Sequence, residues 1–144
     1  MENDLSVSIG RFDRANHNTT LSTNEWNRLL WFTAGDELVF VPAGSVFEED
    51  KFAGDGWVLE FNQHFAVDYL ERYPDLHNHA LVSNTVRGQI SMLLTEALRS
   101  EMNELAILLN HAQEKGQSKL YLQAYADLIF LNANQLYAKQ NGSV

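Results

Sequence analysis

The hydrophobic pattern changes its period near Phe61, and this change divides the chain into two parts. Before it, apolar residues alternate with polar ones or form short runs between glycine turns, as in β-strands. After it, apolar residues recur every three or four positions, as on one face of an α-helix. The stretch Gly56–Phe65 reads as a strand that leads directly into a helix. The sequence therefore predicts an α+β fold, with strands first and helices second.

Size and composition are those of one small globular domain. The chain has 144 residues, of which 45% are hydrophobic and 20% are charged. A domain of this length buries about two-thirds of the surface of its unfolded chain, so these residues suffice for a core. We expect a single domain over 1–144, with a strand part at 1–61 and a helical part at 62–144.

The charge balance and the lack of cysteine exclude several functions. There are 10 Lys and Arg residues against 19 Asp and Glu residues, which gives a net charge of -9. Because nucleic-acid binding depends on clustered Lys and Arg, we expect no direct DNA binding. Without Cys there are no disulfides, thiolate metal sites or Cys nucleophile. No stretch resembles a signal peptide or a membrane span, so we expect a cytoplasmic protein without membrane contact.

Short apolar runs predict the strands. Val7 and Ile9 alternate with polar residues, and Trp26–Thr33 is an aromatic run suited to a central strand. Between them, Arg14–Asn24 is polar and predicts a loop. The later runs are Glu37–Val41, Ser45–Phe47 and Trp57–Phe61, separated by turns at Gly35, Gly44 and Gly54. Several short strands joined by tight turns favour a barrel or a fragment of a sandwich.

Amphipathic stretches predict three helices. Asn62 is a good N-cap for a short helix, which ends before Pro74 because the preceding residue avoids helical geometry. The two long helices are expected at Asn84–His111 and Ser118–Lys139. Gly88 weakens the first of them, and Gly116 is a natural C-cap between them. Two long helices joined by a short turn should pack antiparallel.

The two long helices carry more apolar surface than the predicted strands could cover. In a soluble protein such an excess most often marks an interface with a partner. We therefore expect a homodimer formed by these helices. The candidate interface residues are Leu94, Leu98, Leu105, Leu128 and Leu131.

Three groups of titratable residues suggest chemistry, and each also has a plain structural interpretation. Glu48–Asp50 resembles a metal or acid–base site, but such a charge run usually forms an exposed hairpin tip. Glu60 lies within a strand, where alternation places it on an exposed face or, alternatively, in a pocket. His77 and His79 have the spacing of metal ligands only on a strand, and here they follow a loop signal. We expect no catalytic residues, no metal and no cofactor.

Three segments together resemble a known family. They are Leu29–Gly35, which ends in Phe-Thr-Ala-Gly; Leu38–Phe47, which contains Phe-Val-Pro-Ala-Gly-Ser-Val-Phe; and Gly56–Phe65, which begins Gly-Trp-Val-Leu-Glu-Phe. Their order is similar to the N-terminal cupin-type domain of AraC-family transcription regulators, and the similarity extends over Trp26–Tyr137. It implies a cupin-like antiparallel β-barrel or sheet, followed by antiparallel helices that dimerise.

Departures from the family pattern shape the functional expectation. Asp36 and Glu37 stand where the family has a further hairpin, so the barrel should be short or open. Phe47 stands where the family has a His, which argues against a metal-dependent cupin activity. The two helix-turn-helix units that follow in the regulators are missing before Val144. The resemblance thus implies a non-catalytic module that senses an effector or dimerises, and that modulates transcription through a partner such as a related regulator.

The strand core also offers candidates for binding a small-molecule effector, because ligand pockets are commonly lined by apolar and aromatic side chains. Plain core packing is the alternative for each of them. The candidates are Trp31, Phe32, Phe40, Trp57 and Phe61. Two other interpretations stay open: a small cupin-type isomerase or lyase that uses Glu60 or His64, and a segment cut from a longer regulator.

Overall fold

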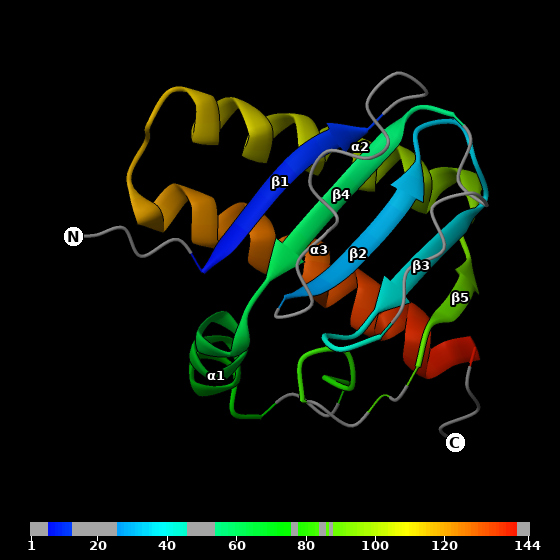
Figure 1. Cartoon of the computed structure of the whole chain (residues 1–144), viewed down its shortest axis with the longest axis horizontal. Coiled ribbons are helices and arrows are strands. Elements are labelled where there is room, and N and C mark those ends of the chain that lie inside the picture. Colours follow the sequence, from blue (N-terminus) through cyan, green and yellow to red (C-terminus); the bar gives the residue numbers. More distant parts are fainter. Residues whose placement is uncertain are drawn as a thin grey trace.

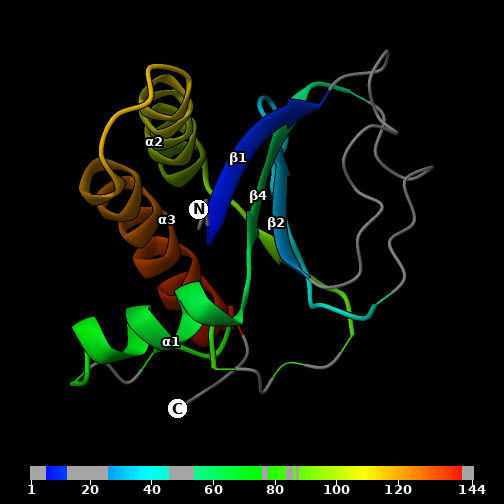
Figure 2. The ribbon, with the colours of Figure 1, turned by 60° about the vertical axis from the view of Figure 1, so that its left-hand side comes forward.

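The computed structural model describes residues 6–12, 26–45, 54–75, 78–83, 86 and 88–140. These residues form one antiparallel sheet of five strands and three helices, and all three helices lie on the same side of the sheet (Figures 1 and 2). The predicted α+β class is confirmed in this coarse form.

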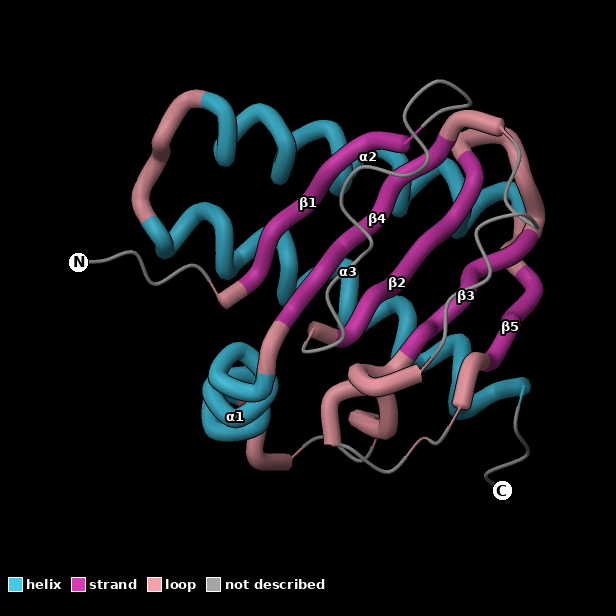
Figure 3. Tube along the Cα trace, viewed as in Figure 1, coloured by secondary structure: helices cyan, strands magenta, loops and turns pink. Residues whose placement is uncertain are grey.

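The sheet is open rather than closed into a barrel. Its strands are β1 (Val7–Phe12), β2 (Asn27–Phe32), β3 (Glu37–Val41), β4 (Gly56–Phe61) and β5 (Ile90–Leu93). They lie in the order β1-β4-β2-β3-β5, and every neighbouring pair is antiparallel (Figure 3). A barrel requires the two edge strands to pair with each other. Here β1 and β5 do not pair, so the described strands form an open sheet, as the expectation of a short or open barrel allowed.

The predicted strands around the glycine turns are confirmed to within one residue at each end. The turn between β2 and β3 depends on Gly35, whose N–H donates to the Phe32 carbonyl oxygen at 3.2 Å. A Cβ atom at position 35 would lie 2.8 Å from the Phe32 Cβ, so any larger residue would force the turn apart. The predicted loop Arg14–Asn24 and the predicted strand residues after Ser45 lie outside the described residues.

Helix α1 (Gln63–Arg72) begins and ends where the sequence predicts. The Asn62 side-chain oxygen accepts a hydrogen bond from the Phe65 N–H at 3.1 Å, as an N-cap should. The helix ends at Tyr73, the residue before Pro74. Because β4 ends at Phe61, a single residue joins it to α1, which fixes the helix at the end of the sheet.

The expected helix Asn84–His111 is wrong in its part before Glu96. Residues Ile90–Leu93 form β5 and pair with β3. Helix α2 (Glu96–Glu114) begins only after Thr95, whose hydroxyl oxygen accepts a hydrogen bond from the Leu98 N–H at 3.1 Å. The second part of the chain therefore also contributes to the sheet.

The physical reason lies in an ambiguous apolar pattern. Met92 and Leu94 are buried, whereas Leu93 between them is 63% exposed, which is the alternation of a strand. The same residues also fit the start of a helical stripe, so spacing alone does not separate the two. Gly88, with φ of +79°, adopts a backbone conformation incompatible with a continuous helix.

Helix α3 (Lys119–Gln140) packs antiparallel to α2, as predicted (Figure 1). Gly116, with φ of +67°, forms the predicted C-terminal cap of α2 and lets the chain reverse. Farther along, the Asn132 side-chain N–H donates to the Glu101 carboxylate at 3.2 Å and links the two helices.

The main core lies between the sheet and the helices. Phe61 of β4 packs edge-on against Phe130 of α3, with ring centroids 4.6 Å apart. A second, smaller cluster lies on the opposite face of the sheet and consists of Leu30, Val39, Val41 and Val58. Both faces of the central strands are therefore buried, as their nearly continuous apolar sequence requires. Among the described residues no helix has the length and hydropathy of a membrane span.

Candidate functional site

A small cavity opens where α1, the first turn of α3 and β1 meet. Its volume is about 90 Å³. Drug-sized ligands occupy roughly 300–1,000 Å³, so this cavity has room only for about three water molecules or for a ligand of a few heavy atoms. The lining residues are Ser6, Val7, His64, Phe65, Asp68, Arg72, Lys119, Leu122 and Gln123.

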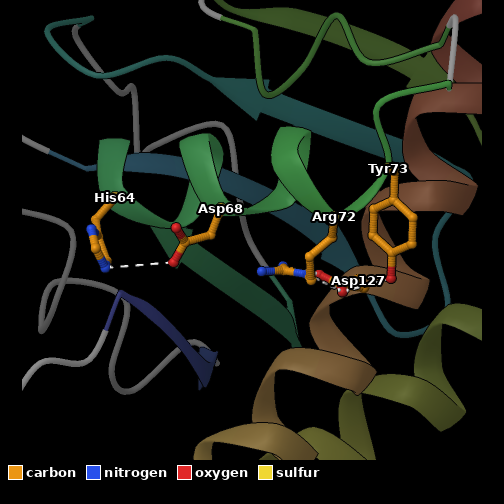
Figure 4. A network of polar contacts seen from close by, with 5 residues as sticks. All are labelled: His64, Asp68, Arg72, Tyr73 and Asp127. Carbon is orange, nitrogen blue, oxygen red and sulfur yellow. Dashed lines mark hydrogen bonds and ion pairs between the residues drawn. The ribbon is translucent and has the colours of Figure 1, made fainter.

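Helix α1 contributes a row of polar side chains to this cavity. His64, Asp68 and Arg72 follow at intervals of four residues and lie on one face of the helix (Figure 4). The His64 ring nitrogen Nε2 lies 3.5 Å from the Asp68 carboxylate, and both side chains are well exposed. Such an exposed pair contributes little to stability. Its chemical relevance is that an acceptor and a titratable ring stand at the mouth of the cavity.

One lining residue of the cavity, Arg72, forms an ion pair with the buried Asp127. Arg72 donates from Nε and Nη2 to the two carboxylate oxygens of Asp127 in α3, at 2.9 and 2.6 Å. The Tyr73 hydroxyl donates to Asp127 Oδ2 at 2.8 Å. Asp127 itself is 2% exposed, so these three donors replace the water that its carboxylate loses on folding.

The ion pair changes the pKa values of Arg72 and Tyr73. Burial disfavours the charged form of Arg72, but its hydrogen bonds to Asp127 and the attraction of that carboxylate outweigh burial and raise the pKa of Arg72. Burial and the hydrogen bond to Asp127 both raise the pKa of Tyr73. Arg72 is therefore a permanent cation, and its Nη1 has no hydrogen-bond partner among the described residues. That nitrogen is available to a ligand or to water in the cavity.

A second polar group is buried deeper between α1 and α3. Burial raises the pKa of Tyr69 to about 12, although the neighbouring Asn134 opposes the shift. The Tyr69 hydroxyl has no hydrogen bond of good geometry among the described residues. Asn134 instead accepts from the Leu81 N–H at 2.8 Å and donates to the Phe130 carbonyl at 2.9 Å. Together with Asp127, this network fixes α1 and the segment after it against α3.

The five aromatic residues proposed from the sequence as ligand contacts do not line this cavity. Trp31, Phe40, Trp57 and Phe61 are at most 4% exposed and belong to the main core. Phe32 packs on the opposite face of the sheet, where it is partly buried. Phe40 alone borders a second hollow, whose volume of about 10 Å³ is too small for a ligand.

The five leucines proposed from the sequence as a dimer interface differ in their exposure. Leu94 and Leu105 are buried within the fold, and Leu98 and Leu131 are partly buried. Only Leu128 is exposed, at 45%. The other large exposed apolar residues of α2 and α3 are Ile107, Leu108, Leu120 and Tyr121.

The structure does not bring Glu60 and His64 together. Glu60 forms an ion pair with Arg28 across β4 and β2, at 3.4 Å and beside the smaller apolar cluster. Burial raises the pKa of Glu60, and Arg28 opposes that shift. His64 lies on α1, in the lining of the cavity. An enzymatic mechanism that uses both residues finds no common site in this geometry.

The other candidate groups give no metal centre in the described part of the chain, where no three His, Cys, Asp or Glu residues are grouped suitably for a metal ion. His79 is partly buried, while His77 and Glu48–Asp50 lie outside the described residues.

Sequence reasoning missed Arg72, which lines the cavity, and its ion-pair partner Asp127. Asp127 is the one acidic residue in α3 and stands within an apolar stripe, which was a readable signal of a buried partner. Arg72, at the last turn of α1, carried no signal of its own.

Comparison with known proteins adds no relationship: no family model, no curated protein and no solved structure matches the chain.

Proposed function

We propose that this chain is a non-catalytic module that dimerises through the exposed side of α2 and α3 and acts by association. The observation that carries the proposal is a set of apolar side chains on this side. Leu108, Tyr121 and Leu128 are 45%, 54% and 45% exposed, and we call them the outer face. Tyr121 and Leu128 are two turns apart on one side of α3.

The antiparallel packing joins these residues into one surface. The hydrogen bond between Glu101 and Asn132 fixes the register of the two helices. About two turns from this bond along each helix, Leu108 of α2 comes level with Tyr125 of α3. Clustered apolar residues of this kind, surrounded by polar ones, are typical of protein–protein interfaces. A second copy of the chain is the simplest partner, because a two-fold axis lets the same residues serve both sides.

The resemblance to AraC-type regulators supplies the biological setting of the proposal. The open sheet is then a shortened relative of the cupin barrel, and α2 and α3 are the dimerising helices. A module that dimerises in this way would act on a related regulator in the cytoplasm by forming heterodimers with it. The net charge of -9 agrees with action through a protein partner rather than directly on DNA.

The test compares two neighbouring residues on α2. Leu108→Glu places a charge in the outer face, and the dissociation constant of the dimer should rise by at least about ten-fold, as for a central interface residue. Ile107→Glu is the matched control: residue 107 is 56% exposed and follows Asn103 by one turn, on the side of α2 away from α3. Sedimentation velocity over a concentration series measures both. A wild-type protein that stays monomeric at high concentration would refute the proposal, as would equal effects of the two variants.

Binding of a small effector is a second candidate function, favoured by Arg72 in the cavity lining, whose Nη1 has no hydrogen-bond partner among the described residues. A small anion such as acetate should shift the backbone amide resonances of α1 and of the first turn of α3. Gln123→Trp places a much larger side chain in the cavity lining without replacing either member of the Arg72–Asp127 pair, and it should abolish the shifts. Shifts that persist unchanged in Gln123→Trp would place the anion elsewhere.

A further inference from the structure

The open sheet leaves two edges, and each edge bonds to one glutamine side chain. An edge strand exposes unpaired N–H and C=O groups, which can pair with a strand of another molecule. In this sheet the edges are β1 and β5. Both lie where the long helices end: α2 ends beside β1, and α3 ends beside β5 (Figures 1 and 3).

The contact at the β1 edge imitates the pairing of a further strand. Gln113, in the last turn of α2, donates from Nε2 to the Ile9 carbonyl oxygen at 2.8 Å. Its Oε1 accepts from the N–H of the same residue at 2.9 Å. A carboxamide has the donor and acceptor of a peptide group, so both outward groups of Ile9 are satisfied by one side chain.

The contact at the β5 edge has the same form. Gln140, the last residue of α3, donates from Nε2 to the Leu93 carbonyl oxygen at 2.9 Å. Its Oε1 accepts from the Leu93 N–H, also at 2.9 Å. Both long helices thus end in a glutamine that makes the same pair of backbone hydrogen bonds, at opposite edges of one sheet.

Ile9 lies in the middle of β1, and only alternate residues of an edge strand point their backbone groups outward. A single glutamine therefore interrupts any continuous ladder there.

We propose that Gln113 and Gln140 close the two edges of the sheet against pairing with a second copy of this chain. An incoming strand has to displace a carboxamide that already makes two hydrogen bonds of good length. Such protection is needed because the strands are apolar: Leu93 on β5 is 63% exposed beside its edge. With both edges closed, the helical side remains as the surface for association. The closure of the edges does not depend on whether the protein dimerises through that side.

The experiment removes the carboxamides one at a time and together. The variants are Gln113→Ala, Gln140→Ala and the double variant, with Gln117→Ala in the exposed turn between α2 and α3 as the control. Hydrogen exchange of the Ile9 and Leu93 amides should accelerate by about ten-fold or more in the matching variant, since each loses its acceptor. The double variant should form larger, concentration-dependent species with a thioflavin T signal, whereas Gln117→Ala behaves as wild type.

The isosteric variants Gln113→Glu and Gln140→Glu separate the opening of the edges from a general failure of the protein to fold. A carboxylate still accepts from the backbone N–H but cannot donate to the carbonyl, so each edge is half open. These variants should assemble to a smaller extent than the alanine variants while keeping the wild-type circular dichroism spectrum. The proposal is overturned if the edge amides exchange rapidly while the assembly state stays that of the wild type. It is equally overturned if exchange at Ile9 and Leu93 does not change.

Discussion

At the scale of single residues, the most consequential group is the buried carboxylate of Asp127. It accepts hydrogen bonds from Arg72, the last residue of α1, and from Tyr73, the residue that ends the helix. A buried charge that loses its partner costs far more than an exposed one, because the remaining charge keeps its desolvation penalty. The pair therefore specifies how α1 docks on α3 rather than merely adding stability.

Asp127→Ala should lower the free energy of unfolding by about 3 kcal/mol, since it leaves the Arg72 guanidinium without its counter-charge. Tyr73→Phe removes only one hydrogen bond to the carboxylate and should cost about 1.5 kcal/mol. Urea unfolding followed by circular dichroism measures both. Equal stability of Asp127→Ala and wild type would show that the ion pair makes no net contribution to the free energy of unfolding.

Stability should also fall at alkaline pH. The pKa of Tyr69 rises from 10.0 to about 12 on folding, so between these values the unfolded chain has lost a proton that the folded chain keeps. Stability is then full below pH 10 and declines as pH rises toward about 12, by up to about 2 kcal/mol. Urea unfolding at several pH values in this range measures how the free energy of unfolding depends on pH. Tyr69→Phe should weaken this pH dependence, and an unchanged pH dependence in that variant would assign the effect to other groups.

The sequence predicts the residue types of the candidate site only in part. His64 stood out as a titratable group at the start of a helix, whereas Arg72 and Asp127 are 55 positions apart and meet only through tertiary packing. Aromatic candidates such as Trp31 failed to mark the cavity because large aromatic side chains serve the core more often than they serve pockets.

At the scale of elements, α2 is held to the sheet by a polar bridge as well as by apolar packing. Asn103 accepts from the Trp31 indole N–H at 2.9 Å and donates to the Thr33 carbonyl oxygen at 2.9 Å. One turn earlier, Arg99 donates to the Gly35 carbonyl oxygen at 2.9 Å. The helix thus provides hydrogen-bond donors for backbone carbonyl oxygens of the β2–β3 turn. Without the helix, water would have to provide these hydrogen bonds.

Asn103→Ala should destabilise the protein by about 2 kcal/mol, because it leaves the buried indole N–H and the Thr33 carbonyl without partners. Asn110→Ala, on the same helix, is the control and should change stability by less than about 0.5 kcal/mol. Thermal and urea unfolding give the difference. A loss of similar size in both variants would mean that helix propensity, not the bridge, is responsible.

Element prediction succeeds where local chemistry decides and fails where a distant partner decides. The cap at Asn62 and the glycine turn at Gly35 act within a few residues, so the sequence alone locates them. Strand β5 differs because its pattern fits two periods, and its pairing with β3 settles the choice. That pairing joins residues about fifty positions apart, which no local signal reports.

At the scale of the whole molecule, the acidic surface acts on association. Two copies with a net charge of -9 each repel one another at long range. Salt screens this repulsion but leaves apolar contact intact. The proposed dimer should therefore tighten as salt rises.

Raising the salt concentration from about 0.02 M to about 0.5 M should lower the dissociation constant several-fold, because the Debye length falls from roughly 20 Å to about 4 Å. Sedimentation equilibrium at each salt concentration provides the measurement. Weakening by salt would instead point to an interface built on opposite charges rather than on the outer face.

The bridge from Asn103 to Trp31 also gives the protein a built-in optical reporter. Trp31 is fully buried at the junction of sheet and helix, and Trp57 is 4% exposed in the same core. An indole that exchanges this environment for water emits at longer wavelength. Separation of α2 from the sheet therefore changes the intrinsic fluorescence without any attached dye. The emission maximum follows the docking of the helices in real time, in dilute protein and in mixtures that contain a tryptophan-free partner.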